Sequence, residues 1–239
     1  MSDLKKKVID SSIFYTEKIL NFDYQLADFN FSALKEYFRG TTALELGPAS
    51  GYMTKNLVNE FAVLHSVDAS DELLLKIPDY PNLVKHCAFF EEFECNLEFD
   101  TIIMSHVLEH ISDPVLILKK VSRWLKNNGV LIVSVPNAKS IHRLAAVEMG
   151  ILKSEYELNS RDIELGHYRV YDMQHLQKDA EMAGFKIVSK GGVFFKPVSN
   201  SQIDQNWTQE MIVGFNKLGK LFPENCAEIF VVCEKKSGS

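Results

Sequence analysis

The sequence predicts an α/β fold in which helices cover both faces of a mainly parallel β-sheet, and three observations lead to this expectation. Short apolar runs alternate with segments of helical spacing between about residues 41 and 135. Several of the runs end in Gly, Asp or Ser, as strands that lead into turns do. Residues 130–135 are apolar apart from Ser134, which is typical of a strand buried on both faces. Such alternation calls for a doubly wound sheet.

The pattern places the elements in order along the chain. Strands are predicted at residues 43–46, 62–67, 83–84, 99–105, 130–135, 185–188 and 227–232. Helices are predicted at residues 52–61, 114–126 and 172–183, with shorter ones after Ser70 and near residue 141. Pro114 suits the first turn of the 114–126 helix, and Asp113 before it suits the N-cap. Asn127–Gly129 is expected to end this helix.

Length and spacing favour one domain with two long insertions. A chain of 239 residues with 46% hydrophobic content can bury a substantial core. The connections at residues 137–171 and 191–225 are longer than those that usually join core elements in compact folds. Insertions of this length are usually lids or substrate loops.

Composition argues against several classes of partner. A net charge of −6 disfavours a nucleic-acid surface, because phosphate binding needs clustered Lys and Arg. No apolar segment is long enough to form the core of a signal peptide or to span a membrane, so we expect a cytoplasmic protein. The four cysteines lack the C-x-x-C spacing of a zinc site, and we expect no metal. A homodimer is compatible with this composition.

The segment ELGPASG (residues 45–51) lies between the first strand and its helix, where open α/β sheets bind ligands. Gly47 and Gly51 let the backbone approach a ligand closely. Ala49 and Tyr52 occupy the second and third glycine positions of the dinucleotide fingerprint G-x-G-x-x-G, so that motif is absent. The segment also lacks the G-K-[ST] of a phosphate-binding P-loop.

Asp68 stands 21 residues beyond Gly47, at the end of the second strand. A carboxylate at this position can accept hydrogen bonds from a ribose diol. Together with the glycine turn, Asp68 therefore indicates a nucleoside ligand that carries no pyrophosphate.

With these residues the sequence resembles the class I S-adenosylmethionine-dependent methyltransferases. ELGPASG is similar to their E/D-x-G-x-x-x-G motif, and FDTIIMSHVLEHISDP (residues 99–114) resembles the fourth strand and following turn of members that make ubiquinone and modified sugars. Ala49 departs from the more usual G-x-G-x-G. The resemblance implies a Rossmann-like seven-stranded sheet of order 3-2-1-4-5-7-6 with the last strand antiparallel.

The resemblance also divides the single domain. Residues 41–136 would form the cofactor-binding core, and residues 1–40 would form an N-terminal cap with helices at Leu4–Leu20 and Phe31–Phe38. Residues 137–171 would form the substrate lid, and residues 172–239 would complete the sheet around the second insertion.

The resemblance further implies S-adenosylmethionine as cofactor, with S-adenosylhomocysteine as product. The residues that it assigns to cofactor binding are Glu45, Gly47, Pro48, Gly51, Asp68, Ala69, Phe90, Glu91, Ser105 and Tyr15.

Methyl transfer mainly requires that donor and acceptor are aligned and that water is excluded. A base is needed only where the acceptor must lose a proton, as an alcohol does. The candidate catalytic residues are His106, which directly follows the fourth strand, and His167, which lies late in the lid. Candidate substrate-binding residues in the lid are His142, Arg143, Tyr168 and Arg169, and their charge favours a phosphate- or carboxylate-bearing acceptor.

The expected function is methyl transfer to a small polar metabolite, with the oxygen of a sugar or of a phosphate- or nucleotide-linked intermediate as the favoured acceptor. Nitrogen of an amino sugar or small amine is the alternative, and a non-catalytic cofactor-binding subunit is another. SHVLEH (residues 105–110) also spells the H-x-x-E-H pattern of a zinc peptidase. That interpretation requires both histidines on one continuous helix and a third ligand downstream.

Overall fold

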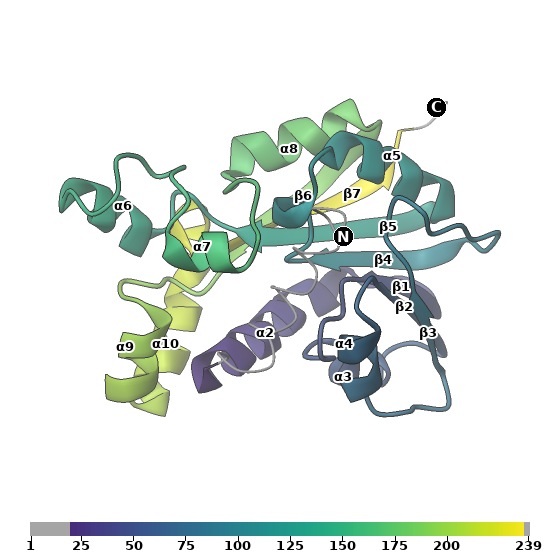
Figure 1. Ribbon diagram of the computed structural model, residues 1–239, viewed down its shortest axis with the longest axis horizontal. Helices are drawn as coiled ribbons and strands as arrows, with labels where there is room; N and C mark the ends of the chain where they lie inside the picture. Colours follow the sequence, from purple (N-terminus) through teal and green to yellow (C-terminus); the bar gives the residue numbers. More distant parts are fainter. Residues whose placement is uncertain (1–19, 237–239) are drawn as a thin grey trace.

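The computed structural model describes residues 20–236, which contain a seven-stranded sheet (Figure 1). The strand β1 pairs in parallel with β2 and β4, whereas β7 runs antiparallel to β5 and β6. The order is β3-β2-β1-β4-β5-β7-β6, which confirms the expected topology. The strands are β1 (Thr42–Leu46), β2 (Val63–Asp68), β3 (Leu83–Cys87), β4 (Phe99–Ser105), β5 (Leu125–Pro136), β6 (Phe185–Val193) and β7 (Glu228–Lys235).

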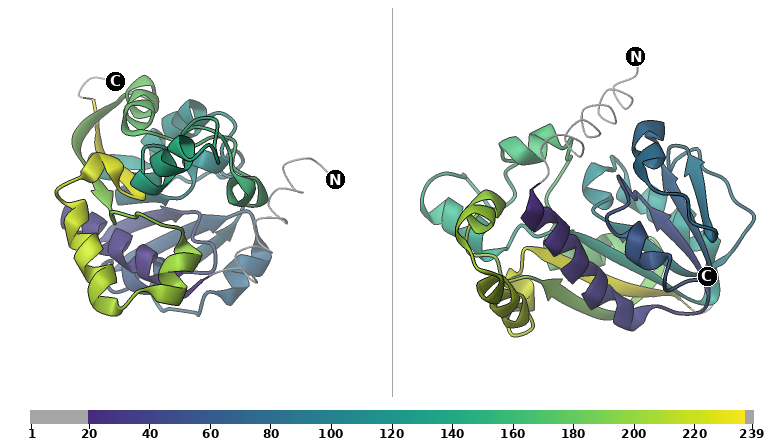
Figure 2. Two further views of the ribbon diagram at one scale, coloured as in Figure 1. Left: turned by 90° about the vertical axis from the view of Figure 1, so that its left-hand side faces the viewer. Right: turned by 90° about the horizontal axis from the view of Figure 1, so that it is seen from below.

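Helices cover both faces of this sheet. Figure 1 shows α5 and α8 on one face and α2, α3 and α4 on the other, and Figure 2 shows α2 lying along its face. The helices are α2 (Asn21–Leu34), α3 (Thr54–Leu57), α4 (Asp71–Lys76), α5 (Pro114–Trp124), α6 (Ile141–Glu148), α7 (Ser160–Glu164), α8 (Met173–Met182), α9 (Asn200–Asn206) and α10 (Gln209–Gly219). Within residues 20–236, three 3-10 turns complete the elements, at Lys35–Tyr37, Leu108–His110 and Pro223–Asn225.

The two faces have separate hydrophobic cores because successive strand residues point to opposite sides. Ile102 and Met104 of β4 belong to the core that contains α5 and α8. Ile103 between them belongs to the core that contains α2 and α10. All three side chains are fully buried. The sheet is therefore a rigid base that fixes the positions of the loops at its strand ends.

The boundaries of several elements differ from the sequence prediction. The expected 52–61 helix is reduced to α3, and the expected Phe31–Phe38 helix is replaced by α2 and a 3-10 turn. The strand β5 begins at Leu125, because this buried side chain pairs with Phe99 across the sheet. The helix α7 lies in the insertion of residues 137–171, where the sequence predicted only the helix near residue 141.

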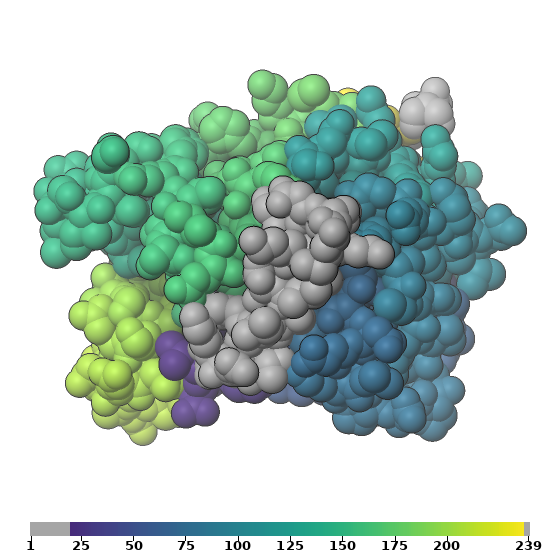
Figure 3. All heavy atoms as spheres, in the orientation of Figure 1, coloured from purple at the N-terminus to yellow at the C-terminus, as the bar shows by residue number. Residues whose placement is uncertain are grey.

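The two long insertions lie at the same end of the molecule. Figure 3 shows the green segment with α6 and α7 beside the yellow-green segment with α9 and α10. The His142 amide donates a hydrogen bond to the Lys196 carbonyl (3.2 Å), which joins the two segments. Within residues 20–236, no helix has the length and apolarity that crossing a membrane requires.

Candidate active site

The glycine turn after β1 brings bare backbone to the end of the sheet. Gly47 has φ +72°, and its amide donates to the Val67 carbonyl (2.9 Å). A Cβ at this position would lie 2.6 Å from Val107 Cγ2. Ala49 also adopts a positive φ, +48°, and Gly51 is buried. The turn therefore depends on glycine at position 47 both for its conformation and for space.

Glu45 lies at the base of this turn and is almost fully buried, with 3% exposure. Its Oε2 accepts hydrogen bonds from Thr54 (2.7 Å) and Ser66 (2.8 Å). Burial raises the pKa of Glu45 to about 7, although the two hydroxyl groups act in the opposite direction. Glu45 is thus a buried carboxyl group with a raised pKa on the wall of the cavity described below.

Asp68 ends β2, and its carboxylate accepts a hydrogen bond from the Ser70 amide (2.8 Å). Burial raises the pKa of Asp68, and backbone amides that include those of Ser70 and Ala49 oppose this shift. Asp68 is therefore held next to the glycine turn. Ala69 is half-buried beside it.

The loop after β3 supplies Phe90 to the same region. Phe90 Cζ lies 3.9 Å from the point that a Cβ on Gly47 would occupy, so its ring is close to the turn. Glu91 is exposed, and its carbonyl accepts a hydrogen bond from Lys120 Nζ (2.6 Å). Tyr15 lies outside the described residues.

Asn30 of α2 is a candidate that the sequence reasoning missed. Its amide nitrogen donates to Ser105 (3.0 Å) and to Ser134 (2.9 Å), which fixes α2 over the ends of β4 and β5. Asn30 is 1% exposed, and its Oδ1 accepts no hydrogen bond from the described residues. A buried amide oxygen without a donor fits a site that a ligand amine completes.

A cavity of about 600 Å³ begins at the glycine turn and extends between α2, the lid and the second insertion. Glu45, Gly47, Pro48 and Ser105 line its inner end. Its outer wall includes Asp23, His106, Asn137, Ser140, His142, Arg143, Arg161, Asp162, His167, Lys196 and Glu228. Asp68 and Phe90 are not among its lining residues, so an adenosine next to them would leave this volume for a methionine moiety and an acceptor.

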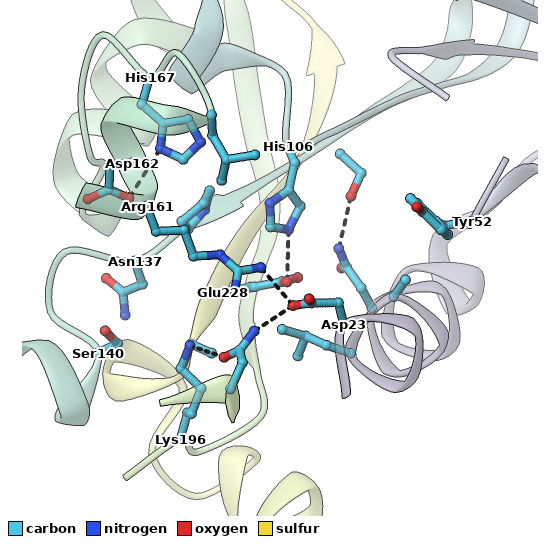
Figure 4. Close-up of a pocket in the computed structure, with 18 of the residues that line it drawn as sticks. Asp23, Tyr52, His106, Asn137, Ser140, Arg161, Asp162, His167, Lys196 and Glu228 are labelled. Carbon is cyan, nitrogen blue, oxygen red and sulfur yellow. Dashed lines mark hydrogen bonds and ion pairs between the residues drawn. The ribbon is translucent and has the colours of Figure 1, made fainter. Parts of the chain in front are cut away.

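His106 points into this cavity and is paired with Glu228 of β7 (Figure 4). His106 Nε2 lies 2.8 Å from Glu228 Oε1, and Nδ1 lies 3.5 Å from Glu109 Oε1. Burial by itself lowers the pKa of His106, but the carboxylates of Glu228 and Glu109 outweigh it and raise the pKa to about 9. His106 is therefore a proton donor near neutral pH. Glu228 gave no signal in the sequence, because it is one acid among many.

The backbone at His106 has φ +56°, and only a 3-10 turn, Leu108–His110, follows it. The two histidines of H-x-x-E-H therefore do not share a continuous helix. The zinc-peptidase interpretation is wrong for this reason.

A polar network closes the opposite wall of the cavity. Arg161 donates to Asp23 Oδ1 (3.0 Å), and Asn200 Nδ2 donates to the same oxygen (2.6 Å). Lys196 Nζ donates to Asn200 Oδ1 (2.7 Å), as Figure 4 shows. Burial lowers the pKa of Lys196 to about 8, and Arg161 acts in the same direction. The lid, α2 and the second insertion thus meet through charged groups that face the cavity.

Arg143 and His142 both line the cavity, but they have different surroundings. The Arg143 guanidinium donates to the carbonyls of Glu155 (2.6 Å) and Glu157 and pairs with Asp162 (3.1 Å). Arg143 therefore holds the lid together. Burial lowers the pKa of His142 to about 2, with Lys196 and Arg143 acting in the same direction, so the ring is neutral.

The remaining lid candidates separate. His167 is 7% exposed and lines the cavity, with Nδ1 3.3 Å from Asp162 Oδ1. Tyr168 and Arg169 are not among the lining residues, and Arg169 Nη2 donates to the Ser112 carbonyl (2.9 Å). The structure therefore brings His167 to the candidate acceptor site and places Tyr168 and Arg169 outside it.

Comparison with known proteins agrees with this geometry. Residues 22–190 match a family model described as a methyltransferase domain. The ubiquinone biosynthesis O-methyltransferase of Rhizobium etli is 23% identical over 188 residues, which cover 76% of this chain and 73% of that protein. Its counterpart in Dinoroseobacter shibae is 25% identical over 183 residues, which cover 72% and 68%.

Solved structures share the fold. An S-adenosylmethionine-dependent methyltransferase from Thermotoga maritima has a TM-score of 0.64 at 17% identity, covering 96% of this chain and 100% of that one. The N-methyltransferase NodS of Bradyrhizobium japonicum, in complex with S-adenosyl-l-homocysteine, has a TM-score of 0.59 at 11% identity, covering 98% and 97%. The family match over most of the chain and the shared sheet lead to one conclusion: this chain belongs to the class I S-adenosylmethionine-dependent methyltransferases.

Proposed function

We propose that this protein transfers the methyl group of S-adenosylmethionine to an oxygen of a small, anionic metabolite, such as a sugar acid or a phosphate- or nucleotide-linked sugar. The observation that carries the proposal is the cavity of about 600 Å³, which joins the glycine turn to a wall with Arg161 and Lys196. A cavity of this size suits a small molecule and excludes a folded protein.

The cofactor brings an activated methyl group, and the protein has to bind and align it. Gly47 and Pro48 would lie against the methionine moiety, and Asp68 would accept the hydroxyl groups of the ribose. Asn30 and Glu45 both face the methionine side, where a carboxylate and an amide oxygen suit the ammonium group of the cofactor.

The acceptor would lie between His106 and the lid. The Arg161 side chain is 40% exposed, and Lys196 is half-buried at the same wall, so both can meet a phosphate or carboxylate. His106 remains protonated through its pairing with Glu228, and its role is to orient the acceptor by donating a hydrogen bond. Glu228, which lines the same cavity and whose Oε2 accepts no hydrogen bond from the described residues, would take the proton that an acceptor hydroxyl loses. The curated relatives are O-methyltransferases, which supports oxygen as the acceptor atom.

An amine is the second candidate acceptor. Asp23 and Glu228 line the same cavity, and two carboxylates can hold an ammonium group. An amino sugar that also carries a phosphate would use both sets of charges.

The test is a panel of acceptors that pairs each phosphorylated or carboxylated sugar with its neutral form, with S-adenosylhomocysteine release as the readout. The anionic forms should have the lower KM. Replacing Lys196 with Met should raise that KM at least tenfold with little change for the neutral forms. Lys220→Met is the matched control, because Lys220 is exposed and outside the cavity. A preference for neutral acceptors that Lys196→Met does not change would contradict the anionic assignment.

A further inference from the structure

Three potential metal ligands meet at the edge of the cavity. Glu109 and His110 end the 3-10 turn Leu108–His110, and His167 lies in the lid. One ligand atom of each lies within 4.8 Å of the other two. The Tyr168 amide donates to the Glu109 carbonyl (2.8 Å), which ties the lid to the turn. The grouping is therefore part of how the lid joins the core.

Glu109 is the first sign that a ligand belongs here. Its side chain is 1% exposed, and neither carboxylate oxygen accepts a hydrogen bond from the described residues. The neighbouring His106 Nδ1 is 3.5 Å from Oε1, while His106 Nε2 forms the closer pair with Glu228. Carboxylates are rarely buried unless they are paired or bind a metal ion. The His106 imidazolium therefore approaches only Oε1, without a hydrogen bond, and Oε2 has no partner among the described residues. A second cation would supply that partner.

The orientation of His167 is the second sign. Its Nδ1 faces Asp162 Oδ1 at 3.3 Å, and Asp162 is itself fixed by Arg143 and by the Asn159 amide (2.9 Å). With a carboxylate beside Nδ1, the Nε2 atom can bind a metal ion. Metal-binding histidines are usually oriented by a carboxylate or carbonyl at the other ring nitrogen in this way. The His110 ring lies edge-on to the His167 ring, with centroids 4.7 Å apart. Two imidazoles and one carboxylate then converge on one point.

We propose that Glu109, His110 and His167 bind one zinc ion, with an open coordination position that faces the cavity. Two histidines and one carboxylate form a donor set that zinc uses where a fourth position is kept for water or substrate. Tetrahedral bonds of about 2.1 Å would bring the ligand atoms to roughly 3.4 Å from one another, so modest side-chain rotation completes the site. The open position follows from His167, which lines the cavity.

This site differs from both earlier expectations. The sequence suggested either no metal or a peptidase site that pairs His106 with His110. In the structure His106 turns to Glu228, and His167 takes its place from the lid. A zinc ion here would stabilise the closed lid and would polarise an acceptor hydroxyl that enters the open position. The second effect rests on the proposed function, whereas zinc binding does not.

The experiment measures zinc binding to full-length protein that a chelator has stripped of metal, without cofactor or acceptor. Calorimetry should show one zinc ion per chain, and Glu109→Gln and His167→Asn should each weaken binding at least tenfold. His175→Asn is the matched control, since His175 is exposed and lies beside a carboxylate, 2.9 Å from Asp172, outside the cluster. Its zinc affinity should equal that of the wild type.

Cobalt substitution tests the same site in the unaltered protein. Visible absorption should report a nitrogen- and oxygen-ligated ion without a thiolate charge-transfer band. A thiolate band, no stoichiometric binding, or equal affinity in folded Glu109→Gln and wild-type protein would overturn the proposal. Methyl transfer assayed with and without zinc then separates the two claims. Zinc bound without any methyl transfer would count against the proposed function alone, and equal transfer by the metal-free protein would overturn the role in polarising the acceptor.

Discussion

Replacing Glu45 with Gln should make the protein more stable and bind its cofactor less well. Glu45 is 3% exposed, and its Oε2 accepts hydrogen bonds from the hydroxyl groups of Thr54 and Ser66. A glutamine carbonyl oxygen can accept both hydrogen bonds. The substitution therefore removes a buried negative charge and keeps the local hydrogen bonding.

The size of the effect follows from the titration of Glu45. Burial raises its pKa from 4.5 to about 7, so the folded state binds more protons than the unfolded state between these values. The stability that the protonated group contributes is complete below pH 4.5 and is lost as the pH rises through 7. Glutamine mimics the protonated form at every pH. The free energy of unfolding of the variant should thus exceed that of the wild type by about 1 kcal/mol at pH 5 and by about 3 kcal/mol at pH 8.

Denaturation in urea, followed by tryptophan fluorescence at pH 5, 6, 7 and 8, measures this difference. Glu60→Gln is the control, because Glu60 lies at the surface and pairs with Lys35. Its stability difference from the wild type should change little with pH. Calorimetry at pH 8 should show that Glu45→Gln binds S-adenosylmethionine at least tenfold more weakly. A stability difference that stays flat or shrinks as the pH rises would refute the reasoning.

Three further outcomes are expected. Gly47→Ala should reduce S-adenosylmethionine affinity at least tenfold in calorimetry, because its Cβ would meet Val107 at 2.6 Å and φ +72° disfavours alanine; unchanged affinity would contradict the tight turn. The KM for an anionic acceptor should rise as the pH passes through 8, where Lys196 loses its proton, and Lys196→Met should flatten this profile; a profile that persists in the variant would exclude Lys196. Arg143→Met should destabilise the lid by about 3 kcal/mol, because Asp162 loses its buried partner. Faster hydrogen exchange confined to residues 137–171 would show this, and unchanged exchange would contradict it.

Much of the fold could be predicted because its signals are local. The strand β4 was expected at residues 99–105 and lies at Phe99–Ser105. Ser70 and Asp113 were expected to cap helices, and each accepts a hydrogen bond from the third residue beyond it. Boundaries set by tertiary packing were missed, as at β5, where a register shift opposite Phe99 lets the strand start at Leu125.

In the site too, residues with a local sequence signal could be predicted, and residues brought together from distant parts of the chain could not. The glycine turn follows β1 directly and Asp68 is the last residue of β2, so the sequence pattern alone placed them at the strand ends. The partners of His106 and Arg161 could not be found in this way, because Glu228 and Asp23 reach the cavity from distant parts of the chain. Arg143 was expected to bind substrate, whereas its guanidinium donates hydrogen bonds to backbone carbonyls of the lid itself. A charge seen in a sequence does not reveal which backbone groups surround it.

The most direct measurement incubates the protein with a metabolite extract and S-adenosylmethionine that carries a deuterated methyl group, and follows the products by mass spectrometry. We expect one labelled product of low mass that bears a phosphate or carboxylate and appears together with S-adenosylhomocysteine. Asp68→Ala should lose the product, and Lys220→Met should retain it. Cofactor binding with no labelled metabolite in any extract would contradict the account and would favour a non-catalytic cofactor-binding subunit.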